Sequence, residues 1–126
     1  MVKAAYPVSA NSASVAANAA RLGEAGVQLL YGTDLAHPDV PWGINAHELM
    51  LMAHTAYRTR PPLEVLSAAT ARAGEHLGLA PLGQLIDGAP ADLIGVRGNP
   101  LEQFKSLEYP DPVISGGVPV ATPAGD

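Results

Sequence analysis

The tripeptide Gly32-Thr33-Asp34 is the stretch of this sequence whose residue types are best suited to chemistry. It directly follows the apolar run Val27-Gln28-Leu29-Leu30-Tyr31, which is typical of a buried parallel strand that delivers one carboxylate at its C-terminal end. Gly32 allows a sharp turn there, and the Thr33 hydroxyl can hold the carboxylate by a hydrogen bond. Asp34 is therefore a candidate site residue, although an aspartate that only caps the following loop would have the same local sequence.

The four histidines do not form a metal site by their spacing alone. His37 would share the loop at the end of the predicted strand, where it could line a pocket or simply be solvated. His47 is followed by a glutamate, as in the helical zinc motif H-E-x-x-H, but the second histidine of that motif is missing. His54 and His76 are interpreted as surface or hydrogen-bonded helix residues.

Length and composition limit the classes of protein to which this chain can belong. Its 126 residues suffice for a domain with a real core, but a complete (β/α)₈ barrel needs roughly 250. The formal net charge of -5 and the scattered basic residues argue against a nucleic-acid surface. The absence of cysteine excludes a disulfide framework, and no apolar stretch approaches the ~18 residues of a membrane span. With no recognisable signal peptide, we expect a cytoplasmic chain that does not contact membranes.

The first two thirds of the sequence predict helices. A narrow face of small residues, Val15, Ala19 and Leu22, indicates a helix that packs closely on a sheet. Asn45 and Glu48 have the spacing of a capping box, which predicts the start of a second helix. The predicted helices cover residues 9–25, 45–57, a segment opened by Pro61-Pro62 with Leu63, Leu66 and Thr70 on one stripe, and residues 72–77.

Glycines and short apolar runs replace this helical pattern from about residue 81. Strands are predicted at residues 93–96 and 112–114, and Ser115-Gly116-Gly117 predicts a hairpin turn into a strand at residues 118–120. Asp92 precedes an apolar run, so we assign it a structural bond to nearby backbone rather than a role in a site. The change in pattern places a domain boundary near Ala80.

The order of these segments, rather than any one of them, resembles the C-terminal end of the metal-dependent amidohydrolase superfamily. The resemblance is to imidazolonepropionase-like and Xaa-Pro dipeptidase-like members, and it extends over nearly the whole chain. The segments that carry it are Gly32-Thr33-Asp34, Glu48-Leu49-Met50-Leu51-Met52, Pro62-Leu63-Glu64-Val65-Leu66-Ser67-Ala68-Ala69-Thr70, Leu77-Gly78-Leu79, Gly83-Gln84-Leu85-Ile86-Asp87-Gly88, Ala91-Asp92-Leu93-Ile94, Gly98-Asn99-Pro100-Leu101 and Val113-Ile114-Ser115-Gly116-Gly117.

This resemblance implies an α/β fold that is the C-terminal fragment of a TIM-barrel amidohydrolase. Residues 1–79 would form the last helix, the last barrel strand and the helices that follow. Residues 80–126 would add the C-terminal strands of a small β-sandwich domain. The family holds one or two divalent metal ions, often zinc, at the strand ends, and Asp34 matches only the aspartate that ends the last barrel strand.

The resemblance also implies a reaction for the complete enzyme. A metal-activated water would hydrolyse a carbon–nitrogen bond in an amide, a lactam or a dipeptide. Asp34 would ligate the metal and carry the proton from the water to the leaving nitrogen. Residues 35–42 would then line the pocket for the small-molecule or dipeptide substrate, with His37 as a polar contact.

The sequence departs from the family because it has neither an H-x-H pair nor strand-end histidines before Asp34. A catalytic zinc site uses about three protein ligands, so we expect the isolated chain to hold no zinc tightly and to be inactive. An apolar strand without its neighbours would favour self-association or an N-terminal partner fragment. The chain could be a truncated product, a subunit of a split enzyme, or a non-catalytic structural or interaction module, and the sequence does not decide between them.

Overall fold

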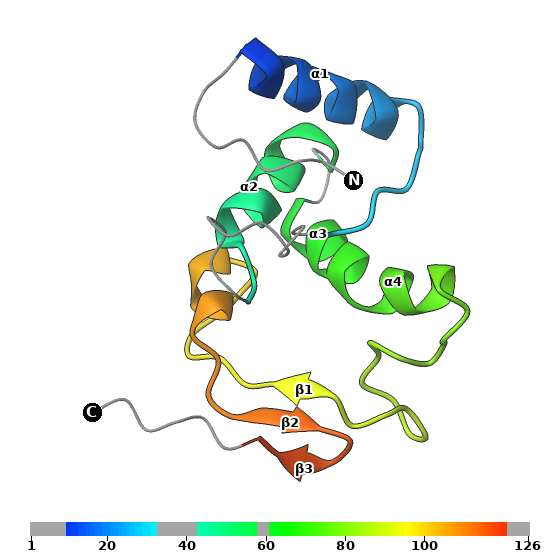
Figure 1. Cartoon of the computed structure of the whole chain (residues 1–126), viewed down its shortest axis with the longest axis vertical. Helices are drawn as coiled ribbons and strands as arrows, with labels where there is room; N and C mark the ends of the chain where they lie inside the picture. Colours follow the sequence, from blue (N-terminus) through cyan, green and yellow to red (C-terminus); the bar gives the residue numbers. More distant parts are fainter. Residues whose placement is uncertain (1–9, 33–42, 58–60, 121–126) are drawn as a thin grey trace.

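The computed structural model describes residues 10–32, 43–57 and 61–120, which form helices followed by a small sheet (Figure 1). The helices are α1 (Ala10–Glu24), α2 (Ala46–Thr55), α3 (Pro61–Ala69) and α4 (Ala71–His76). A 3-10 helix, η1 (Phe104–Glu108), lies between the first and second strands of the sheet in sequence. The predicted helices are therefore confirmed, each to within a few residues of the expected bounds.

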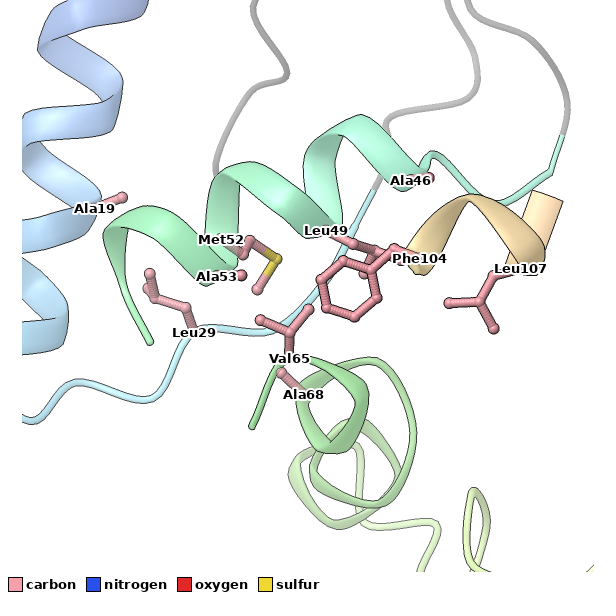
Figure 2. Close-up of a cluster of buried hydrophobic side chains, with 10 residues drawn as sticks. All are labelled: Ala19, Leu29, Ala46, Leu49, Met52, Ala53, Val65, Ala68, Phe104 and Leu107. Atoms are coloured by element: carbon pink, nitrogen blue, oxygen red, sulfur yellow. The ribbon is translucent and has the colours of Figure 1, made fainter. Parts of the chain in front are cut away.

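Helix α2 lies at the centre of the helical part and packs against α1, α3 and η1. The core consists of buried side chains from these elements and from the segment that follows α1 (Figure 2). Leu49, Met52 and Val65 are almost completely removed from water. The buried residues are Ala19, Leu29, Ala46, Leu49, Met52, Ala53, Val65, Ala68, Phe104 and Leu107.

The small-residue face of α1 packs against another helix, and the prediction that it packs on a sheet is wrong for the described residues. Ala19 is buried and Val15 packs against the core, but Leu22 is 43% exposed. The small side chains let α1 approach α2 closely. The predicted stripe on α3 is correct in part: Leu66 packs against the core, but Leu63 is half exposed and the buried side chains are those of Val65 and Ala68.

Residues 27–32 do not form the predicted barrel strand. A strand needs a neighbouring strand as a hydrogen-bonding partner, and the sheet of the described part of the chain lies elsewhere. The prediction that this run is apolar on two buried sides is also wrong here, since Val27 is 44% exposed while Leu29 is buried. The backbone of this segment bonds instead to Ala68 of α3 and to the side chain of Tyr57, which follows α2.

The three strands β1 (Leu93–Ile94), β2 (Val113–Ser115) and β3 (Val118–Pro119) form an antiparallel sheet in the order β1-β2-β3. Ser115 pairs with Val118 across a two-residue turn. Gly116 and Gly117 both have positive φ, at 57° and 79°, as a type I′ turn requires. The predicted hairpin is confirmed, and it connects β2 and β3 at the lower edge of Figure 1.

Candidate functional site

Asp34 and His37, the two predicted site residues, lie outside the residues that the structure describes. The described chain stops at Gly32 on one side of them and resumes at Gly43 on the other. What the structure does show is how these two flanks are held. Each flank is fixed to a helix by hydrogen bonds, and tyrosine hydroxyls take part on both sides.

The first flank is fixed at Leu29 by the side chain of Tyr57. The Leu29 amide donates to the Tyr57 hydroxyl at 3.0 Å, and the same hydroxyl donates to the Leu29 carbonyl. One side chain thus satisfies both backbone groups of a buried residue, as a ladder partner would in a sheet. The guanidinium of Arg72 lies over the Tyr57 ring, 5.8 Å from its centroid, and adds a cation–π contact.

Two further bonds fix Tyr31 itself. Its amide donates to the carbonyl of Ala68 in α3, at 3.4 Å. Its hydroxyl accepts a hydrogen bond of 2.7 Å from the amide of Asn45, fourteen residues further along the chain. Tyr31 therefore connects the first flank to α3 through its backbone and to the start of α2 through its side chain.

Asn45 caps α2, as predicted, but only half of the predicted capping box forms. Its Oδ1 accepts from the amides of His47, at 3.0 Å, and Glu48, at 3.2 Å. In a capping box the Glu48 side chain would accept from the Asn45 amide, and here the Tyr31 hydroxyl accepts from that amide instead. The Ala46 amide donates at 2.8 Å to Oε1 of Glu108, which reaches back from η1.

Burial and nearby negative charge both keep the phenol of Tyr31 protonated. Burial raises the pKa of the Tyr31 phenol, and the nearby carboxyl groups of Glu48 and Glu108 raise it further, against the lowering effect of the bond from Asn45. Glu48 is only 1% exposed. The Tyr31 hydroxyl therefore stays protonated and neutral at ordinary pH, and its oxygen remains a hydrogen-bond acceptor for the Asn45 amide.

Replacing Glu108 with alanine should lower the free energy of unfolding by about 1–2 kcal/mol, because the first amide of α2 loses its acceptor. The Lys105 hydrogen bond, with that of the Ala46 amide, holds the Glu108 pKa below its ordinary 4.5. The pKa of Glu108 is lower in the folded chain than in the unfolded chain. The stabilisation by its carboxylate is therefore complete above about pH 4.5 and is lost as the pH falls through the pKa of the folded state. Urea unfolding of the unmodified chain and of Glu108→Ala at pH 7 and pH 3 measures this effect. A difference in unfolding free energy between the two that is as large at pH 3 as at pH 7 would contradict the prediction.

The described residues do not offer a metal site. Among residues 10–32, 43–57 and 61–120, no three His, Cys, Asp or Glu side chains lie close enough together to hold an ion. His54 is exposed and its Nδ1 lies 2.7 Å from the Met50 carbonyl of its own helix, as predicted for a surface residue. Nor is any described helix long and apolar enough to cross a membrane.

Asp92 has the structural role that the sequence predicts, with a partner further away than expected. Its Oδ1 accepts from the Gly116 amide at 2.8 Å and from the Ser115 hydroxyl at 3.1 Å. The carboxylate therefore ties the start of β1 to the hairpin turn more than twenty residues later. The prediction that Asp92 bonds to backbone is therefore confirmed, but the backbone group belongs to the hairpin turn and not to residues next to Asp92 in sequence.

The sequence pattern of the amidohydrolase family matches residues 6–120 of this chain. Ochratoxinase from Aspergillus niger is 42% identical over 92 residues, which cover 71% of this chain and 18% of that protein.

Solved structures show the same relation. A prolidase-like protein from Bifidobacterium longum superimposes with a TM-score of 0.77 at 36% identity, over 89% of this chain and 27% of that one. A Xaa-Pro dipeptidase with methionine bound in its active site superimposes with a TM-score of 0.76 at 28% identity, over 90% of this chain and 27% of that one. The chain thus spans about a quarter of the length of these two structures.

Proposed function

This chain belongs to the amidohydrolase family, and from that premise we propose that it is the C-terminal part of a hydrolase that cleaves carbon–nitrogen bonds. The observation that carries the proposal is the superposition of nine tenths of the chain on a Xaa-Pro dipeptidase. A dipeptide with a C-terminal proline is accordingly the first substrate class to test. An N-acyl amide or a lactam is the alternative within the same reaction.

Asp34 is the residue of this chain that we propose to act in the reaction. A carboxylate positioned beside the attacking water can accept its proton and return it to the leaving nitrogen. Because the described residues do not fit a metal ion by themselves, a divalent ion such as zinc would need ligands from beyond the described residues, with Asp34 contributing one oxygen. His37 is proposed to contact the substrate from the same segment.

We further propose that residues 1–79 belong to a barrel and residues 80–126 to a small β-sandwich. The distribution of elements supports this division, since α1 to α4 precede residue 80 and all three strands follow it. Phe104 and Leu107 of η1 extend into the core beside α2 and connect the two parts. Glu108 adds a hydrogen bond to the first turn of α2.

A hybrid enzyme tests the proposed function. Residues 6–120 would replace the corresponding segment of a Xaa-Pro dipeptidase, and hydrolysis of a Xaa-Pro dipeptide and of an N-acyl amide would be measured in parallel. We expect turnover of at least one of the two substrates. The control is the same dipeptidase truncated before the replaced segment, and a hybrid no more active than this control would contradict the proposal.

Association is the second candidate role, favoured by the exposed apolar side chains at the end of α4 and beyond it. Leu77 and Leu79 are 66% and 55% exposed, and Leu85 and Ile86 are 86% and 57% exposed. Such exposure within ten residues is typical of surfaces that contact another chain. We expect the isolated chain to self-associate in sedimentation experiments at rising concentration, or to bind an N-terminal fragment of a relative, and a monomer that binds no such fragment would contradict this expectation.

A further inference from the structure

The small sheet ends at β3 on the side that lies away from the helices. In Figure 1, β1 lies on the side of the sheet nearer the helical part and β3 on the far side. Within the described ranges, no strand pairs with the outer edge of β3. Both residues of β3, Val118 and Pro119, are exposed, and so is Val120. The free amides and carbonyls of such an edge can pair with a strand of another chain.

The register of the hairpin shows which backbone groups face this outer edge. Val120 donates its amide to the Val113 carbonyl at 2.8 Å, so these two residues form a hydrogen-bonded pair. In an antiparallel ladder such pairs alternate with pairs that share no hydrogen bond. Pro119, which is paired with Ile114, therefore directs its backbone nitrogen and carbonyl away from β2. The position of β3 whose backbone faces the outer edge is thus occupied by a residue that has no N–H to donate.

Charge does not protect this edge. From Pro112 to Gly125 the sequence has no Asp, Glu, Lys or Arg, and valines flank Pro119 on both sides. An uncharged segment with high β-propensity pairs readily with a copy of itself when it contains no proline. Natural edge strands are commonly blocked by charged side chains or by proline. Of these two devices, the hairpin contains only the proline.

We propose that Pro119 keeps β3 from pairing with the β3 strand of a second copy of this chain. A two-fold axis at this position would let two such edges pair antiparallel, with position 119 opposite itself. With an N–H at this position, the two chains would exchange two N–H···O=C bonds, one in each direction. Pro119 removes both donors. The proposal concerns β3 alone, and it depends neither on the proposed reaction nor on the exposed apolar side chains between Leu77 and Ile86.

Pro119→Val is the variant that tests this proposal. It supplies the missing amide, and it breaks no ladder bond of the hairpin because the backbone of Pro119 faces away from β2. We expect the association constant from sedimentation experiments to rise by about tenfold or more, the effect of two added hydrogen bonds of ordinary net strength. The amide at position 119 should also exchange with solvent more slowly as the chain concentration is raised. An unchanged association constant, or association without protection of this amide, would overturn the proposal.

Two control variants separate edge pairing from other effects of the substitution. Pro90→Val makes the same change at an exposed proline outside the strands, and it should leave association unchanged. Pro119→Lys also supplies the amide, but pairing about the two-fold axis would place two like charges opposite each other, so it should associate no more than the unmodified chain. A gain in either control as large as that in Pro119→Val would show that the amide on the β3 edge is not the cause, and would overturn the proposal.

Discussion

Replacing Asp34 with asparagine should lower kcat of the hybrid enzyme by about 10²–10⁴-fold, the usual contribution of a positioned proton acceptor. The amide has nearly the same shape as the carboxylate, but it cannot take a proton from the attacking water. KM should change much less, because the lost interaction belongs to the transition state. Steady-state kinetics on the substrate that the hybrid hydrolyses would measure both parameters, with circular dichroism to confirm that the variant folds.

Asp92→Asn is the matched control, since it makes the same chemical change at an aspartate with a structural role. Asp92 accepts hydrogen bonds from Gly116 and Ser115 at the hairpin turn. Its replacement should cost about 1 kcal/mol of stability and leave kcat close to normal. Near-normal turnover in Asp34→Asn, or an equal loss in both variants, would show that Asp34 is not the proton acceptor.

Sequence patterns were sufficient to predict an element where residues close in sequence determine its structure. The hairpin followed from Gly116 and Gly117, because the two-residue turns that suit twisted strands need one or two positive φ angles and glycine adopts such angles without strain. The start of α2 followed from Asn45, whose side chain bonds the next amides whatever surrounds it. In both cases the determining atoms lie within a few residues of one another.

Sequence patterns were insufficient where the hydrogen-bonding or packing partners of a segment come from distant parts of the chain. The apolar run at residues 27–31 predicts a strand, but a ladder needs another strand beside it, and here Tyr57 and Ala68 provide the bonding groups instead. The face that α3 turns to the core was predicted only in part for a similar reason, since Leu66 packs there but Leu63 does not. Its core side depends on where α2 lies, and both faces of the helix carry apolar residues.

The anchoring residues of the candidate site had a weaker signal still. Tyr31 ends the apolar run, and its ring suggests burial, but nothing in the sequence pairs its hydroxyl with the amide of Asn45. The nearest signal is the incomplete capping box. The Asn45 amide donates to the Tyr31 hydroxyl and not to the Glu48 side chain that a capping box would use. Tyr31 comes from a distant part of the chain, so only the tertiary structure identifies it as the acceptor.

Gly23→Ala should destabilise the chain by about 3 kcal/mol, at the upper end of the usual cost of overpacking. In an exposed helix the same change would stabilise by roughly 1 kcal/mol, so sequence alone predicts the opposite sign. The structure reverses it because a Cβ at Gly23 would lie 2.2 Å from the carbonyl oxygen of Ala56, at the end of α2, and 2.9 Å from two further backbone atoms of that residue. Backbone cannot rotate away as a side chain can, so α1 would have to move off α2.

Gly32→Ala is the control for this change, since a Cβ there would meet no atom of the described residues within 4 Å and the Gly32 backbone has no positive φ. Its effect on stability should stay within about 0.5 kcal/mol. Urea unfolding of the two variants beside the unmodified chain gives the comparison at one temperature. A Gly23→Ala variant as stable as the Gly32→Ala variant would mean that α1 does not approach α2 through its glycine. Such a result would contradict the close packing of α1 on α2 that is described above for the core around Leu29.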